Sequence, residues 1–426
     1  MNPLILLLIV FFGLIFIRVP IAFALGISSM VTIIYIDLPF TSVINHMFAS
    51  INSFTLLAVP FFLLLGSLMN DGGITNRLIN FSRTLVGHIK GGLGHINILV
   101  SMIMAGLSGS AAADTAAVGS TLIPAMVKEK YDAGFTVAIT AASSTLGVII
   151  PPSIMMVVYG AMAQVSIGKL FLAGIVPGIL IGLVQMGYTY YMAVKHDYPA
   201  YPRATIKEVR TSFKQAVATL LLPVIILGGI VGGFFTPTEA AVIAVFYALV
   251  LMFFYKSLKV KELPRILKES VIMYSLPMFA IATAGIMGWL IGYLHAPELV
   301  ADFITNITTS SSGIYLMIVA FLLVVGTFLS PLEAIIIFLP ILMKLGAIAN
   351  LDPVHMGIIV CLTLAVGMVT PPYGICLLIA TQIAEISTPR AFLAVLPIIG
   401  LTLGVILLGV FVPNLFLFLP NLLMPD

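Results

Sequence analysis

Residues 104–124 read MAGLSGSAAADTAAVGSTLIP, a run of small and polar residues inside a chain that is mostly Leu, Ile, Val, Met and Phe. The 426 residues are 61 % hydrophobic and only 8 % charged, with a mean hydropathy of +1.20. Soluble domains carry about 25 % charged residues, so this much apolar surface requires lipid as its solvent. We therefore predict an all-α polytopic membrane protein, in which residues 104–124 are an interruption that needs an explanation.

The charges and cysteines exclude several classes of function. The net charge of +3 gives no reason to expect nucleic-acid binding, because Lys and Arg lie in short connections between apolar segments. Cys361 and Cys376 fall in apolar stretches and are expected to be reduced thiols packed between helices. We expect no catalytic residues and no metal site beyond sodium. Segment 4–17 lacks a basic start and a cleavage site, which predicts a retained helix.

Ten apolar segments approach the roughly 20 residues that a membrane span requires. Two further apolar regions, 92–127 and 313–345, are broken at their centres by small polar residues. The ten predicted spans are about 4–17, 20–37, 54–70, 135–160, 171–194, 216–233, 237–255, 270–294, 355–380 and 391–418.

The distribution of Lys and Arg predicts the orientation. Thirteen of the nineteen lie in three connections, which we place in the cytoplasm, whereas 295–312 has none and is placed outside. Only two complete spans then fit between the cytoplasmic connections at 77–90 and 195–214, so 92–127 is predicted to be a re-entrant hairpin from the cytoplasm. The same count makes 313–345 a hairpin that enters from outside. The thirteen are Arg77, Arg83, Lys90, Lys195, Arg203, Lys207, Arg210, Lys214, Lys256, Lys259, Lys261, Arg265 and Lys268.

An internal repeat supports this topology. TLGVIIPPSIMMVVYG (145–160) resembles AVGMVTPPYGICLLIA (365–380), and three further pairs of segments match at offsets between 217 and 221 residues. Residues 1–194 and 216–426 are therefore predicted to be two copies of one unit, joined by a cytoplasmic connection at 195–215. One copy begins outside and the other inside, which makes an inverted-topology repeat, typical of secondary transporters. Each copy holds one hairpin and one helix broken at a Pro-Pro pair, at 135–160 and 355–380.

The interruption at 104–124 is then the tip of the first hairpin. Irregular backbone persists in a bilayer only where it is buried in protein or lines a cavity, so the tip is predicted to face an internal site. Gly106 and Gly109 permit the turn. Asp114 follows the tip and either caps the return helix or holds Na⁺, since ionisable groups inside membranes are functional candidates. Ser330 and Glu333 form the pattern of a capping box in the second hairpin, where we expect Glu333 to serve its own helix.

Free carbonyl and hydroxyl oxygens at the tips and breaks suit a hard cation such as Na⁺, and helix N-termini suit an anion. The predicted site thus couples Na⁺ to an anionic solute. The predicted sodium ligands are Ser108, Gly109, Ser110, Asp114, Ser144, Gly147, Pro151, Gly326, Gly367 and Thr370. The predicted substrate-binding residues are Ser110, Ser153, Thr327 and Ser330.

These motifs resemble those of the large membrane subunit of TRAP transporters, the tripartite ATP-independent periplasmic family. The resemblance covers the whole chain and rests on the following segments: GLSGSAAADTAAVGS (106–120), GVIIPPS (147–153), GTFLSPLEA (326–334) and GMVTPPYG (367–374).

The resemblance implies an elevator-type transporter in the inner membrane of a bacterium. It implies two partners: a small four-helix membrane subunit on a separate chain, and a periplasmic binding protein that delivers an organic acid such as sialic acid or a C4-dicarboxylate. Uptake would be driven by Na⁺. The chain has Ser330 where the family often has Asp, which changes the polarity expected of the substrate cavity.

Three other readings of these residues remain at the level of sequence. A stand-alone Na⁺/anion symporter would share the hairpins and the inverted repeat but would work without a binding protein. A channel is less suited to two inverted broken helices than alternating access is. An intramembrane serine protease would need a His on a neighbouring helix, and the hairpin is flanked by His88 and His95 only at its cytoplasmic end.

Overall fold

The computed structural model describes residues 1–255 and 260–425, and within these ranges the chain forms α-helices and three short 3-10 turns without any β-strand. The predicted all-α class is confirmed. Lys256 and Lys259 of the third basic connection lie outside the described residues.

The first half of the chain forms ten α-helices and two 3-10 turns. They are α1 (Pro3–Phe16), α2 (Ile21–Tyr35), α3 (Thr41–Ile51), η1 (Thr55–Leu57), α4 (Ala58–Asp71), α5 (Ile74–Val86), α6 (Gly92–Ser108), α7 (Ala111–Lys128), α8 (Ala133–Ser144), η2 (Thr145–Val148), α9 (Ile154–Ala163) and α10 (Ile167–His196).

The described part of the second half follows the same order. It contains α11 (Ile206–Val231), α12 (Pro237–Phe254), η3 (Val260–Glu262), α13 (Leu263–Tyr293), α14 (Ala296–Thr305), α15 (Ser311–Gly326), α16 (Pro331–Ile348), α17 (Pro353–Gly367), α18 (Ile375–Ala384), α19 (Thr388–Phe411) and α20 (Pro413–Leu423). From α5 and α14 onward the α-helices correspond one to one, except that α20 is an additional helix, and η2 has no counterpart in the described second half.

Both hairpins and both broken helices form within a few residues of their predicted bounds. Between α6 and α7, Gly109 takes a left-handed conformation with φ 62°, which glycine adopts without strain. Between α15 and α16, Ser330 and Glu333 form the predicted capping box. The first break lies between η2 and α9, the second between α17 and α18, and both Pro-Pro peptide bonds are cis.

Three helices were not predicted. α3 precedes the expected span at 54–70 and meets α4 at a bend of 64°, whereas the corresponding helix of the second half, α13, is continuous. α5 and α14 lie in stretches treated above as connections. Both are short and amphipathic: in α5, Ile74, Leu78 and Phe81 are buried, whereas Asn76, Asn80 and Arg83 are exposed. This apolar stripe stabilises a surface helix, but it is too narrow to register as a membrane span.

Two boundaries also differ from expectation. The connection predicted at 195–215 is partly helical, because α11 begins at Ile206 behind a capping box formed by Thr205 and Glu208. The last predicted span, 391–418, is divided into α19 and α20, since Pro413 cannot continue the hydrogen bonding of α19.

Among the described residues, six helices are long and apolar enough to cross a membrane by themselves, and the bent pair α3–α4 would make a seventh; the six are α10, α11, α12, α13, α16 and α19. The other expected spans form shorter or broken helices. α1 and α2 have 14 and 15 residues, or about 21 and 23 Å at 1.5 Å per residue.

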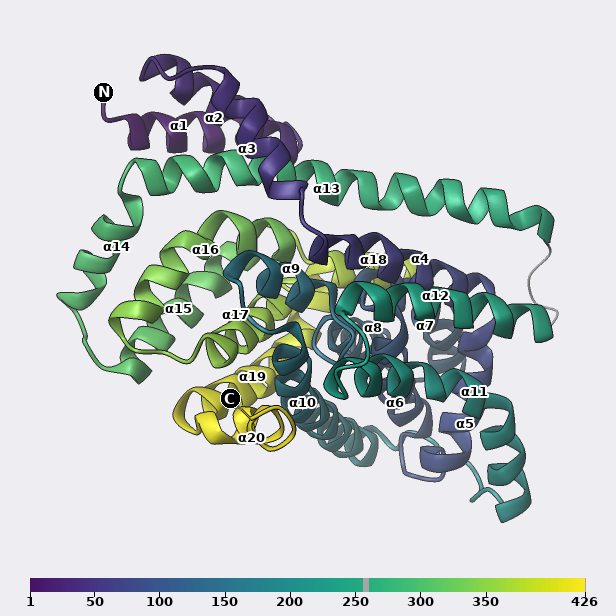
Figure 1. The fold of residues 1–426 in the computed structure, drawn as a ribbon. Coiled ribbons are helices and arrows are strands. Elements are labelled where there is room, and N and C mark those ends of the chain that lie inside the picture. The colour runs from purple at the N-terminus through teal and green to yellow at the C-terminus, as the bar shows by residue number, and fades with distance from the viewer. Residues whose placement is uncertain (256–259, 426) are drawn as a thin grey trace.

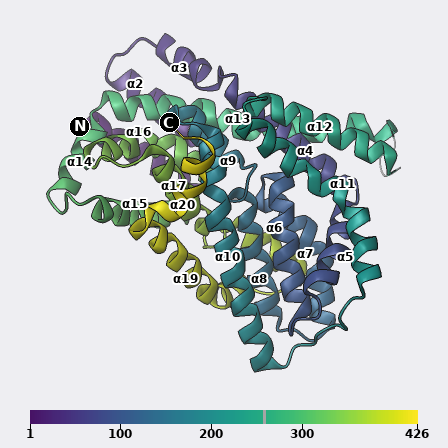
Figure 2. The same ribbon diagram turned by 60° about the horizontal axis from the view of Figure 1, so that its bottom comes forward.

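Figures 1 and 2 show how the helices are arranged. The long α13 runs along one edge and packs against α2, α3, α4 and α16. The half-helices α9 and α18 lie centrally between the hairpins, and each contacts the hairpin of the opposite copy: α18 packs on α7, and α9 packs on α16. The two copies are therefore interlocked through their breaks.

The orientation of the chain in the membrane can be tested with single cysteines at two exposed positions, Lys128 and Asn306. Lys128 ends the first hairpin, formed by α6 and α7 and called hairpin 1 below, and Asn306 follows α14. In a background in which the buried Cys361 and Cys376 are replaced by Ala, we expect a membrane-impermeant thiol reagent to label Lys128→Cys only from the cytoplasmic side and Asn306→Cys only from outside. Labelling of both cysteines from one side would contradict the re-entrant topology of hairpin 1.

Candidate functional site

The tip of hairpin 1 is closed by a serine–aspartate pair. Ser108 ends α6, and its hydroxyl donates a 2.6 Å hydrogen bond to Oδ1 of Asp114 in the first turn of α7. The backbone N–H of Ser110 donates to the Ser108 hydroxyl at 3.2 Å, and Ser110 in turn caps α7 by accepting from the N–H of Ala113. Asp114 is fully buried. The small polar run therefore satisfies its own irregular backbone within the fold.

The second carboxylate oxygen of Asp114 lacks a hydrogen-bond partner among the described residues. Oδ2 is buried and faces the first helix break, where a Cβ built on Gly147 would lie 2.5 Å from it and 3.1 Å from the backbone nitrogen of Ala111. A buried carboxylate oxygen without a partner is costly unless a cation or a proton neutralises it. The contact between the hairpin tip and the break thus creates a local demand for positive charge.

The predicted residues in the first break are engaged within it. The hydroxyl of Ser144 donates to the carbonyl of Thr140 at 2.8 Å, and that of Ser153 donates to the carbonyl of Val148 at 2.6 Å. Ser153 also caps α9 by accepting from the N–H of Met156. Pro151 lies between η2 and α9, in the non-helical stretch that faces Gly106 and Gly109 of the tip.

The second hairpin meets its break through a close backbone approach. A Cβ on Gly367 would collide with the backbone of Gly326, so the two glycines allow this approach. The N–H of Tyr373 donates to the carbonyl of Thr327 at 2.8 Å. The hydroxyls of Thr327 and Thr370 bond to carbonyls of their own helices, those of Val324 and Val366.

The two copies differ in their acidic residues. Ser110 and Ser330 are both helix N-caps and lie 220 positions apart, but at that offset Asp114 corresponds to Ala334. Glu333 accepts from the hydroxyl of Ser330 at 2.7 Å and from its N–H at 3.1 Å, as the predicted capping box requires. Only the first of the two tips therefore presents a buried carboxylate oxygen without a partner.

A buried polar network that the sequence analysis did not identify joins α6 to α8. Nδ2 of Asn97 donates to the hydroxyl of Thr140 at 2.6 Å, and the hydroxyls of Ser101 and Ser143 lie 3.0 Å apart. Side-chain hydrogen bonds between helices hold membrane proteins together. The signal was present in the sequence, since Asn97 and Ser101 share one helical face at a spacing of four, but only packing shows which helix they meet.

A cavity of about 520 Å³ opens beside the tip of hairpin 1. One wall is α7 from the tip toward its exposed end, and the opposite walls come from α4, α5 and α13. Its lining residues are Leu63, Gly66, Ser67, Asn70, Gly73, Thr75, Asn76, Ser108, Ser110, Ala113, Ala116, Ala117, Ser120, Thr121, Ile266, Glu269 and Met273.

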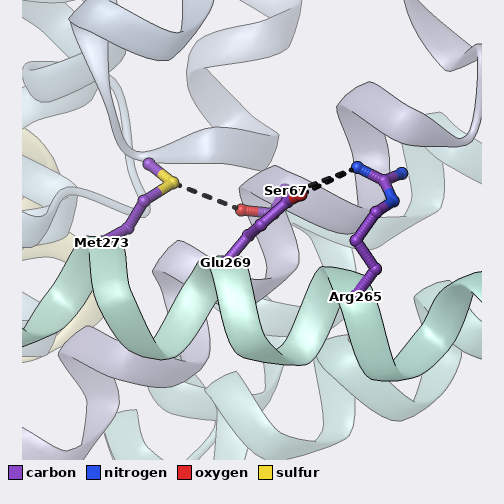
Figure 3. Close-up of polar contacts among 4 residues, drawn as sticks. All are labelled: Ser67, Arg265, Glu269 and Met273. Carbon is purple, nitrogen blue, oxygen red and sulfur yellow. Dashed lines mark hydrogen bonds and ion pairs between the residues drawn. The ribbon is translucent and has the colours of Figure 1, made fainter.

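The α13 wall contributes Glu269, the one charged residue in the described lining of this cavity, and Arg265 binds its carboxylate. Figure 3 shows Arg265, Glu269 and Met273 on one face of α13, directed toward Ser67 of α4. Nη1 of Arg265 lies 3.1 and 3.0 Å from the two carboxylate oxygens of Glu269, and the hydroxyl of Ser67 lies 4.0 Å from the sulfur of Met273.

The structure divides the predicted substrate-binding residues. Ser110 lines the cavity, together with Ser108, whereas Ser153, Thr327 and Ser330 are not among its lining residues. The sequence analysis assigned these four residues to the substrate because they lie at the hairpin tips and at the first break. The cavity instead lies on the side of hairpin 1 that faces α4 and α13.

Substitution of Gly147 tests the contact between the tip and the break. We expect Gly147→Ala to lower stability by about 1–3 kcal/mol, the usual cost of overpacking, because its Cβ would press on Asp114 and on the start of α7. The measurement is the thermal unfolding midpoint of the purified protein in detergent. Gly187→Ala in α10 is the matched control, since a Cβ there meets no atom within 4 Å; equal midpoints for the two variants would contradict the proposed contact.

Comparisons with known proteins agree with this architecture. The sequence matches the family model described as tripartite ATP-independent periplasmic transporter, DctM component, over residues 8–415. It is 38 % identical over 415 residues to the sialic acid TRAP transporter large permease protein SiaM of Vibrio cholerae, covering 96 % of each protein. It is 39 % identical over 400 residues to the C4-dicarboxylate TRAP transporter large permease protein DctM of Pseudomonas aeruginosa, covering 93 % of this chain and 94 % of that one.

A solved structure shares the fold at low sequence identity. The YdaH transporter of Alcanivorax borkumensis aligns with a TM-score of 0.63 and 14 % identity, covering 97 % of this chain and 98 % of that one. This likeness concerns the fold alone. Together with the family match, which covers almost the whole sequence, it shows that the chain is a multi-pass membrane protein and a transport permease rather than an enzyme, and that it belongs to the DctM family, the large permease component of TRAP transporters.

Proposed function

We propose that this protein couples Na⁺ entry to the import of an organic acid anion across the bacterial inner membrane. The observation that carries the proposal is the fully buried Asp114, whose Oδ2 has no hydrogen-bond partner among the described residues at the contact between the hairpin tip and the first break. A Na⁺ ion at this contact would bind the carboxylate together with carbonyl and hydroxyl oxygens. Hard cations prefer such oxygen ligands.

The other predicted sodium ligands belong to the same proposal. Ser108 and Ser110 hold the tip closed around Gly109, while Ser144, Gly147 and Pro151 belong to the helix and break that the tip meets. Gly326, Gly367 and Thr370 occupy the corresponding contact of the second copy, where a second ion would be bound by backbone carbonyls and a hydroxyl, without a carboxylate.

The transport movement we propose is of the elevator type. The two hairpins and the two broken helices interlock through α7 with α18 and through α16 with α9, so they are suited to move as one body. α4 and α13 line the opposite walls of the cavity and would belong to the stationary scaffold. A cavity between these two groups would open to one side of the membrane in each end state.

The organic acid is suggested by relatives whose names specify sialic acid and C4-dicarboxylates. Family membership further supports two partners for this chain: a periplasmic binding protein that delivers the acid, and a small four-helix membrane subunit. Near the tip, the positive end of α7 would attract the carboxylate of the acid.

The test is uptake of candidate acids into proteoliposomes that contain this protein, its small subunit and its binding protein. We expect uptake to require an inward Na⁺ gradient and the binding protein. Uptake driven by a pH gradient in Na⁺-free buffer would contradict Na⁺ coupling. Uptake that is equally fast without the binding protein would instead support a stand-alone symporter.

Asp114→Asn keeps the shape of the side chain and removes its charge. We expect it to weaken Na⁺ dependence by about 1–3 kcal/mol of coupling free energy, roughly 5–150-fold in the Na⁺ concentration that gives half-maximal uptake. Asp302→Asn, at an exposed position on α14, is the control and should leave this concentration unchanged. Normal Na⁺ dependence in folded Asp114→Asn would make Asp114 a helix-capping residue only.

A further inference from the structure

The cavity beside hairpin 1 has apolar wall residues together with side chains that form hydrogen bonds without carrying charge. Eight of its seventeen lining residues bear hydroxyl or amide side chains. They extend from Ser110 at the half-buried tip to Thr121 and Asn76 at the exposed mouth. A cavity of about 520 Å³ falls within the ~300–1,000 Å³ of typical small-molecule sites. The wall is therefore suited to a solute with many hydroxyl groups.

The charges of the wall favour a solute with one carboxylate over a solute with two. Among the lining residues that the structure describes there is no Lys, Arg or His, and the one ionisable group is Glu269. Arg265, the nearest cation on the same helix, is already bound to both oxygens of that carboxylate. The N-terminus of α7 can attract one carboxylate at the tip. A second carboxylate, placed toward α13, would meet Glu269 and no unengaged cation in the wall.

The wall also offers hydrogen-bond acceptors that a dicarboxylate cannot satisfy. The side-chain oxygen of Asn70 is buried and has no hydrogen-bond partner among the described residues, and Asn70 lies on α4 in the cavity lining. Both this oxygen and the carboxylate of Glu269 accept hydrogen bonds. An ionised dicarboxylate without hydroxyl groups, such as succinate, has only acceptors, whereas the hydroxyls of a sugar acid are donors. A buried acceptor left without a donor weakens binding.

We infer that this cavity selects a polyhydroxylated monocarboxylate, a sugar acid, and discriminates against small dicarboxylates. The carboxylate of the acid would lie at the tip near Ser110, and its hydroxyls would donate to Asn70 and Glu269 across the cavity. The inference rests on the proposed transport function and specifies the substrate class of the same site.

The test is protection of a cysteine in the wall. Ser67→Cys, in a background with Cys361 and Cys376 replaced by Ala, is labelled by a maleimide in the purified complex with the small subunit, in detergent and in the presence of Na⁺. We expect gluconate and N-acetylneuraminate to slow labelling at about tenfold lower concentrations than succinate, the effect of roughly 1.4 kcal/mol. Thr211→Cys, an exposed position on α11 outside the cavity, should be labelled at the same rate with every acid.

Two substitutions test the assigned groups. Asn70→Leu should remove most of the preference for the sugar acids, and Glu269→Gln should lower the concentration of succinate needed for protection. Asp302→Asn is the control for Glu269→Gln. It should change neither the preference for the sugar acids nor the concentration of succinate needed for protection. Protection by succinate at equal or lower concentrations than both sugar acids would overturn the inference, as would an unchanged preference in both Asn70→Leu and Glu269→Gln.

The outcome is separable from that of the proposed function. Absence of protection by all three acids, in a complex that still shows Na⁺-driven uptake of an organic acid, would overturn the substrate inference alone. Absence of any Na⁺-driven uptake would overturn the transport function on which it rests.

Discussion

Backbone that leaves the helical conformation inside a bilayer has to find hydrogen-bond partners within the protein, because lipid offers none. Among the described residues, this chain leaves it at two hairpin tips and two Pro-Pro breaks, besides the bend between α3 and α4. The partners lie in the same segment or in the segment that faces it: Ser108 and Ser110 close the first tip, Ser153 bonds back across the first break, and Tyr373 joins the second break to the second tip. The packing of the remaining helices places these four points against one another.

The two copies meet this requirement with different chemistry. In the second copy the tip is held by a capping box, and its glycines approach the break backbone to backbone. The first copy adds Asp114, which the tip holds by one oxygen and leaves unpaired at the other. A repeat that is nearly symmetric in its helices is thus asymmetric in its charge. This asymmetry concentrates the proposed ion coupling in the first copy.

The cavity shows how the mobile and stationary parts of such a transporter can share one site. Its inner end is the hairpin tip, and its far walls are α4, α5 and α13. A movement of hairpin 1 relative to α13 would change which groups face a bound acid, so affinity and accessibility would change together. Glu269 and Arg265 lie on the α13 side, where they would act on the solute in only part of the cycle.

The sequence alone determined the membrane environment, the two hairpins, the two breaks and the repeat. Each of these follows from local signals, namely apolar runs, Gly and Ser at the tips, and proline, which cannot donate the helical hydrogen bond. The short helices α3, α5 and α14 were missed, because a narrow apolar stripe does not resemble a span. Tertiary structure alone decided that Asp114 faces Gly147, that Asn97 meets Thr140, and that Ser110 shares a cavity with Ser67 and Glu269 while Ser153 and Ser330 do not. These pairs lie far apart in the chain, and the physical reason is that helix packing, rather than residue type, sets which faces of distant helices meet.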